Sequence, residues 1–73
     1  MSDVKYEIIK HIGIISTSKS NWNRELNLVS WNGKDPKYDL RDWSPDHGRM
    51  GKGMTLNDNE AVCLTELLKK AAG

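Results

Sequence analysis

The sequence predicts an α+β domain in which four β-strands are followed by one helix. Upstream of residue 57, apolar and polar side chains alternate in several stretches, and polar turns separate these stretches. The last part of the chain shows apolar residues at helical spacing behind a capping motif. No repeat or linker interrupts this order, so residues 1–73 form one predicted domain, with Met1–Asp3 as a loose end.

The first two strands are predicted over residues 4–16 and 22–32, which a polar turn joins. The first strand is rich in Ile and Tyr. Its Tyr6, Ile8, Ile12 and Ile14 share one parity, which Ile9 and Ile15 break, and this pattern indicates a bulge or a bend near His11–Gly13. In the second strand the apolar parity switches between Leu28 and Val29. This switch predicts either a strongly bent strand or another bulge.

The stretch 36–56, PKYDLRDWSPDHGRMGKGMTL, predicts two further strands, 37–43 and 50–56, on either side of a polar turn. Alternation over 37–43 is strict, so Tyr38 and Leu40 share one face, which we expect to meet the core. The opposite face is therefore expected to be the outer one. It carries Lys37, Asp39, Arg41 and Trp43 in a row.

A helix is predicted behind Asn57, which is a good N-cap and which Glu60 complements in a capping-box pattern. Its apolar stripe is wider than one small sheet covers, which indicates contact with a partner subunit. The stripe consists of Ala61, Leu64, Leu67, Leu68, Ala71 and Ala72, and Val62 and Cys63 widen it.

The size of the chain limits how stable an isolated copy can be. The chain has 73 residues, and a domain of this size buries only about 60% of its unfolded surface. A single cysteine, Cys63, excludes an internal disulfide, and no CxxC or HxxxH pair suggests a structural metal. We therefore expect a homodimer. The lone cysteine, the lack of a signal peptide and the lack of a long apolar run favour a cytoplasmic location away from membranes.

Several residues of the third strand and the following turn invite a catalytic or metal-binding interpretation. Asp39 and Asp42 have opposite parity, however, and no HxH or HExxH spacing accompanies them. Ser44 and His47 could serve as a nucleophile and a base, but turns rich in Ser, Asp and His are common without catalysis. The sequence GKG at 51–53 lacks the spacing of a P-loop. We predict no catalytic residue, metal, cofactor or small-molecule substrate, and we expect both Ser44 and His47 to be replaceable with little loss of binding.

Cations and tryptophans make up the stronger candidate site. Net charge is only +1, so any basic surface must be created by folding, and a mixed solvated surface is the alternative. Proteins that bind single strands combine a cationic groove with aromatic stacking platforms, although each tryptophan could equally belong to the core. We expect Asp39 to pair with Arg41 or Lys37. The candidates from pattern are Trp22, Arg24, Trp31, Lys34, Lys37, Arg41, Trp43, Arg49 and Lys52.

Three segments resemble one known family. WNG at 31–33, PKYDLRDW at 36–43 and MGKGMTL at 50–56, followed by a short helix, are similar to the positive-cofactor-four (transcriptional coactivator p15) family. The likeness is greatest to its small bacterial members of the YdbC type, and it extends from about Tyr6 to Leu68. The pairing of DxRxW with GKGxxL at this spacing is fairly specific.

The resemblance implies a curved four-stranded antiparallel sheet with a C-terminal helix, dimerised through helix and strand contacts. It also implies binding of single-stranded DNA across the sheet surfaces, largely without sequence preference. The long Ser- and Lys-rich N-terminal region of the eukaryotic coactivators has no match here, so the nucleic-acid-binding core is implied rather than direct coactivation. The strand-binding positions of the family match Trp31, Arg41, Trp43 and Lys52, and with them Lys37.

These observations together predict a homodimeric binder of single-stranded DNA, with RNA as a second ligand class. Its role would lie in transcription regulation, replication or repair, in the cytoplasm or at the nucleoid. In this prediction Lys37, Arg41 and Lys52 contact phosphates, while Trp31 and Trp43 stack on bases. The alternative is a protein–protein interaction module that uses the sheet edge or the helix stripe and binds no nucleic acid.

Overall fold

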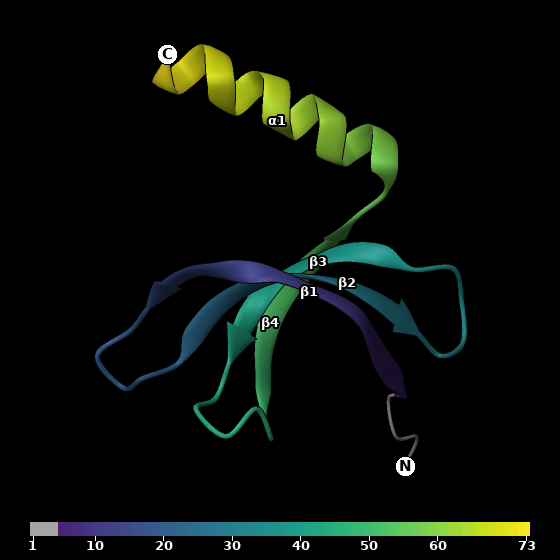
Figure 1. Ribbon diagram of the computed structural model, residues 1–73, viewed down its shortest axis with the longest axis vertical. Coiled ribbons are helices and arrows are strands. Elements are labelled where there is room, and N and C mark those ends of the chain that lie inside the picture. Colours follow the sequence, from purple (N-terminus) through teal and green to yellow (C-terminus); the bar gives the residue numbers. More distant parts are fainter. Residues whose placement is uncertain (1–4) are drawn as a thin grey trace.

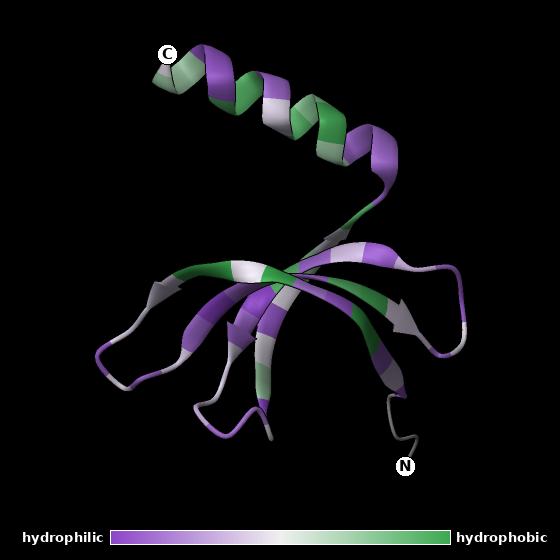
Figure 2. Cartoon of the chain, viewed as in Figure 1, coloured by the Kyte–Doolittle hydropathy of each residue, from purple (hydrophilic) through white to green (hydrophobic). Residues whose placement is uncertain are grey.

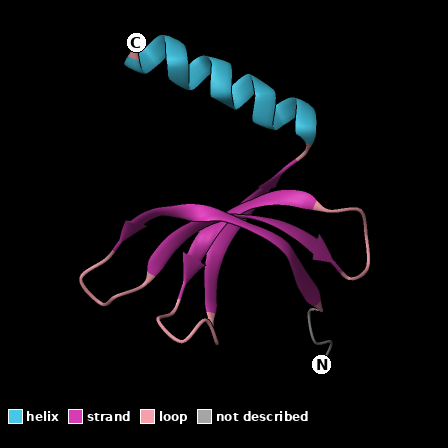
Figure 3. Ribbon diagram, in the orientation of Figure 1, coloured by secondary structure: helices cyan, strands magenta, loops and turns pink. Residues whose placement is uncertain are grey.

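The computed structural model describes residues 5–73, and it shows four strands and one helix in the predicted order (Figure 1). Met1–Asp3, expected to be a loose end, and Val4 lie outside the described residues. The strands form one open antiparallel sheet in the order β1-β2-β3-β4, and the helix follows the sheet (Figure 3), so the predicted fold class is confirmed. The elements are β1 (Tyr6–Thr17), β2 (Asn23–Trp31), β3 (Lys37–Trp43), β4 (Met50–Leu56) and α1 (Asp58–Ala72).

Irregular pairing bends β1. At each of its register shifts, β1 advances two residues while β2 advances one, so β1 carries the extra residue. Bulges of this kind increase twist and bend the strand, and the sheet arches strongly in Figure 1. The predicted irregularity near His11–Gly13 is confirmed. The shifts fall between Ile8 and Lys10, between His11 and Gly13, and between Ile14 and Ser16.

The second predicted bulge is absent from the ladder between β2 and β3. Pairing runs without a shift from Asn23 opposite Trp43 to Val29 opposite Lys37. The apolar parity switches between Leu28 and Val29 because the two side chains point to opposite faces, and both faces of β2 are apolar there. The bulge interpretation of this switch is therefore wrong.

The face of β3 that was predicted to be the outer one is the more buried face in the structure. Asp39 and Trp43 are fully buried, together with Val29 on the same face of β2. Tyr38 and Leu40, which were expected to meet the core, are only half-buried. The predicted outer face thus forms the core of the single chain, because the arched sheet folds its concave face onto itself.

Helix α1 lies over the convex side of the sheet and approaches it only at β3 and β4 (Figure 1). The predicted capping box is confirmed, since the Asn57 side chain accepts from the Glu60 N–H and the Glu60 side chain accepts from the Asn57 N–H. No residue of the helix is buried in the single chain, although apolar segments, green in Figure 2, recur along it. The helix is too short and too polar to span a membrane.

An apolar groove of about 920 Å³ lies between the helix and the convex face. Leu26 and Leu40 line it from the sheet, and Leu64 and Leu68 line it from the helix. Leu68 exposes 58% of its surface. The helix stripe is therefore largely uncovered in a single copy of the chain.

Candidate nucleic-acid interface

Four rings from separate segments form an aromatic cluster on the concave face. The ring centroid of Tyr6 lies 5.7 Å from that of Trp31 and 5.6 Å from that of Trp43. His47, from the loop between β3 and β4, stacks on Trp43 with a centroid separation of 3.9 Å and an interplanar angle of 5°. Asn23 at the start of β2 pairs with Trp43, whereas Trp31 ends that strand. The two tryptophans thus lie at opposite ends of the β2–β3 ladder, and the curvature of the sheet places both of them against Tyr6.

Burial separates the roles of the two clustered tryptophans. Trp43 has no exposed surface, so this structure offers none of its ring to a base. Trp31 is only half-buried, although its ring nitrogen is buried without a hydrogen-bond partner. Of the two predicted stacking residues, the structure thus leaves only Trp31 accessible from solvent.

Arg41 is held by a buried carboxylate on the same strand. Its Nε donates to Asp39 Oδ2 at 2.6 Å and its Nη2 donates to Asp39 Oδ1 at 2.7 Å, so the pair is bidentate. The Arg41 guanidinium carbon lies 4.7 Å from the centroid of the Trp31 ring. Because the Arg41 side chain is only 14% exposed, its main contacts are internal. The expectation that Asp39 pairs with Arg41 is confirmed.

Gly53 allows Arg41 to lie across β4. It stands opposite Arg41, and a Cβ at this position would come within 2.3 Å of the Arg41 Cβ and 2.5 Å of the Leu40 carbonyl oxygen. We expect Gly53→Ala to lower the free energy of unfolding by about 1–3 kcal/mol, measured by urea denaturation, because the strands must separate locally. Gly51→Ala is the matched control, since its Cβ would meet nothing closer than 3.6 Å. Equal losses in the two variants would contradict this account.

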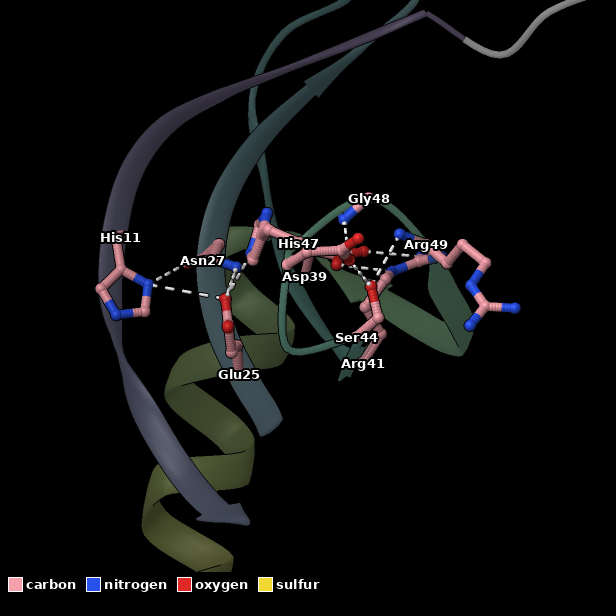
Figure 4. Close-up of polar contacts among 10 residues, drawn as sticks. His11, Glu25, Asn27, Asp39, Arg41, Ser44, His47, Gly48 and Arg49 are labelled. Atoms are coloured by element: carbon pink, nitrogen blue, oxygen red, sulfur yellow. Dashed lines mark hydrogen bonds and ion pairs between the residues drawn. The ribbon is translucent and has the colours of Figure 1, made fainter. Parts of the chain in front are cut away.

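Figure 4 shows a polar cluster centred on Glu25, which includes His47 of the aromatic cluster. Glu25 is 4% exposed, and its Oε1 accepts hydrogen bonds from His47 Nε2 at 3.0 Å and Asn27 Nδ2 at 3.1 Å. His11 Nδ1 lies 3.7 Å from the same oxygen and donates to Asn27 Oδ1 at 2.6 Å. Burial raises the pKa of Glu25, but the hydrogen bonds and the two histidines outweigh burial and hold that pKa below its ordinary value.

This pKa shift predicts acid sensitivity. Because the pKa of Glu25 is lower in the folded state, its carboxylate stabilises the fold above the ordinary value of 4.5. That stability is lost as the pH falls through the lower, folded pKa. Urea unfolding at a series of pH values below 5 should therefore show a weaker pH dependence for Glu25→Gln than for the native chain. Parallel curves would show that Glu25 contributes nothing to acid unfolding.

The loop between β3 and β4 is braced by its own hydrogen bonds. Ser44 Oγ donates to Asp46 Oδ1 at 2.7 Å and accepts from the Arg49 N–H at 2.9 Å. The Ser44 hydroxyl, and after it the Gly48 N–H, lower the pKa of Asp46. Ser44 and His47 are engaged with different partners, so the loop does not assemble them as nucleophile and base. Within residues 5–73, no group of three or more His, Cys, Asp or Glu side chains could hold a metal ion.

Arg24 and Lys52 lie near each other on the convex side of the sheet. Arg24 Nε donates to Asp42 Oδ1 at 2.9 Å, and this hydrogen bond raises the pKa of the guanidinium. Lys52 borders the same shallow depression of about 210 Å³ as this pair, together with Arg41. Three of the predicted cations thus lie close together, but two of them already hold a carboxylate.

The remaining candidates lie at the ends of the sheet. The guanidinium carbon of Arg49 is 5.8 Å from the ring centroid of the half-buried Trp22. Lys34 and Lys37 are exposed at the turn between β2 and β3. No ion pair among residues 5–73 involves Lys34, Lys37 or Lys52. These lysines are available to an external anion.

The sequence analysis missed three members of this site. Tyr6 and His47 complete the aromatic cluster, and Glu25 anchors His47. Tyr6 was assigned only to a strand, because nothing in its local pattern indicates contact with Trp43. One sequence signal could have indicated His47. This histidine precedes Gly48 in a turn that is rich in residues able to hydrogen-bond to the backbone.

Comparison with known proteins identifies one family. A family model described as Transcriptional Coactivator p15 (PC4) matches residues 18–67, from the turn before β2 to the last turns of α1. An uncharacterized protein of Treponema pallidum (strain Nichols) is 50% identical over 66 residues, which cover 90% of this chain and 78% of that protein. The match includes the hairpin of β3 and β4 and the start of the helix. The chain belongs to the Transcriptional Coactivator p15 (PC4) family.

Proposed function

We propose that the protein binds single-stranded nucleic acid, single-stranded DNA above all, largely without sequence preference. The family is known for single-stranded DNA binding and coactivation, which supports nucleic-acid binding here. The observation that carries the proposal is that three lysines are exposed and outside any ion pair of the described residues, while Arg49 lies over the half-buried Trp22. Phosphate contacts give affinity without reading sequence, and stacking adds to it for any base. The residues concerned are Lys34, Lys37, Lys52 and Arg49, with Trp22 and Trp31.

The paired arginines have a different part in this proposal. Arg41 and Arg24 each hold a carboxylate, so a phosphate must compete with that partner. We assign Arg41 the role of positioning Trp31, because the guanidinium lies against the Trp31 ring while Asp39 holds it. Lys37 and Lys52 then carry the phosphate contacts.

Binding to oligo-dT tests the proposal. Oligo-dT should quench tryptophan fluorescence at low salt, and added salt should weaken binding. Lys37→Ala and Lys52→Ala should each weaken binding to any sequence and reduce the slope of log affinity against log salt by about one. Lys69→Ala, at the far end of the helix, is the matched control. Absence of any quenching at low salt would refute the proposal, and a gel shift with single strand, duplex and RNA would define the preferred ligand.

The proposed binding form is a homodimer. A second copy is the occupant proposed for the apolar groove, because the groove and the exposed helix stripe are uncovered in one chain and the domain is small. Sedimentation at micromolar concentration should show a species of twice the 8.3 kDa chain mass. A species of 8.3 kDa alone would exclude the dimer.

The same groove favours the second candidate function, a protein–protein interaction module. In that case the groove would take a helix of another protein, and oligo-dT would leave the fluorescence unchanged. In the first case we propose a non-enzymatic role in transcription regulation, replication or repair, in the cytoplasm or at the nucleoid. The oligo-dT titration separates the two functions.

A further inference from the structure

His47 has a backbone conformation that residues other than glycine adopt uncommonly. Its φ is +61°, in the left-handed region that glycine adopts most easily, and Gly48 is its direct neighbour. Asn21 and Asn32 share this region, but His47 is the residue among the three whose ring joins the aromatic cluster. Strained residues of this kind cluster at functional sites.

The contacts of the His47 ring leave one side of it free. Trp43 covers one ring face at 3.9 Å, and Glu25 Oε1 engages the Nε2 edge at 3.0 Å. The side chain is nevertheless 39% exposed. This exposure belongs to the opposite ring face and the remaining edge, since the other surfaces are occupied. An aromatic ring fixed on one face and open on the other has the form of a stacking platform.

We propose that His47 is the base-stacking residue at this end of the sheet, in place of the buried Trp43. The proposal rests on the function proposed above and names a contact within it: a nucleobase stacks on the free face of the imidazole. Trp43 supports the ring from below and Glu25 fixes its rotation, so little freedom remains to be lost when a base binds. The sequence expectation that His47 can be replaced with little loss of binding is thereby reversed.

Two substitutions of His47 separate the contribution of its ring to binding from the contribution of its hydrogen bond. His47→Ala and His47→Phe both remove the contact to Glu25, but only His47→Phe retains a ring over Trp43. We expect His47→Ala to weaken oligo-dT binding about fivefold or more, and His47→Phe to remain within about threefold of the native chain. Lys69→Ala on the helix is the control, because Lys69 lies outside both the aromatic cluster and the polar cluster around Glu25. It should bind like the native chain.

Photocrosslinking decides the question even if His47→Ala fails to fold. An oligo-dT with 5-iodouracil at single positions should crosslink to His47 of the native protein, identified by mass spectrometry. Adducts confined to other residues, or a folded His47→Ala that binds as tightly as the native chain, would overturn the proposal and leave nucleic-acid binding intact. If the native chain binds no oligonucleotide at all, the proposed function fails and this inference fails with it.

Discussion

Replacing Trp43 with alanine is expected to lower the free energy of unfolding by about 3–5 kcal/mol, the usual cost of truncating a buried tryptophan. Trp43 is the largest fully buried side chain, and it contacts Tyr6 on one side and His47 on the other. The free energy of unfolding of a typical domain is only about 5–15 kcal/mol. The Trp43→Ala variant of this small chain should therefore be largely unfolded at moderate denaturant concentrations. Urea unfolding at one fixed protein concentration measures the change, because the proposed dimerisation would make stability depend on concentration.

Trp22→Ala provides the contrast. Trp22 is half-buried and its ring contacts Arg49 at the surface, so its loss should cost about 1 kcal/mol or less. If Trp22 stacks on bases, this variant should instead weaken oligo-dT binding while it melts near the native temperature. A Trp43→Ala chain that keeps native stability but loses DNA binding would show that Trp43 acts at the interface, as the sequence first predicted.

Replacing Asp39 with alanine should be about as damaging, by roughly 3–5 kcal/mol, because it leaves the mostly buried Arg41 without its counter-charge. Asp39 is fully buried and accepts both hydrogen bonds of the bidentate pair. Arg41→Met should also destabilise the fold, since it strands the Asp39 carboxylate in the core. Thermal or urea unfolding of the two single variants measures both losses.

The double variant Asp39→Leu/Arg41→Met tests whether the charges themselves are needed. Removing both partners leaves no unpaired charge, so the double variant should be more stable than either single variant. If Arg41 serves mainly to position Trp31, the double variant should lose DNA affinity even where it is well folded. An Asp39→Ala chain that unfolds like the native one would contradict the buried ion pair.

These two predictions alter how the Lys37–Trp43 strand is understood. Its alternation correctly placed Lys37, Asp39, Arg41 and Trp43 on one face. On that face, however, the structure leaves Lys37 exposed, pairs Asp39 with Arg41 and buries Trp43. Under the proposed function, nucleic acid is therefore expected at the margin of the concave face, where Lys37, Trp31 and His47 remain accessible. It would reach Lys52 around the edge strand β4.

The sequence by itself determined the local structure. Side-chain alternation located β3 at its true bounds, and the polar turn after it set the start of β4. Asn57 and Glu60 located the start of the helix, and the broken parity of the first strand indicated a bulge near His11–Gly13. These features depend on neighbours within a few residues, so a single sequence contains them. The motif pairing in the hairpin identified the family for the same reason.

Only the tertiary structure decided which face of the sheet became the core. Alternation divides a strand into two faces but does not say which one is covered, because coverage depends on curvature and on distant segments. Here the bulges of β1 arch the sheet, and the arch brings Tyr6 onto Trp31 and Trp43 across its concave side. The same closure buries Trp43 beneath His47, and so moves the candidate stacking surface from a strand to a turn.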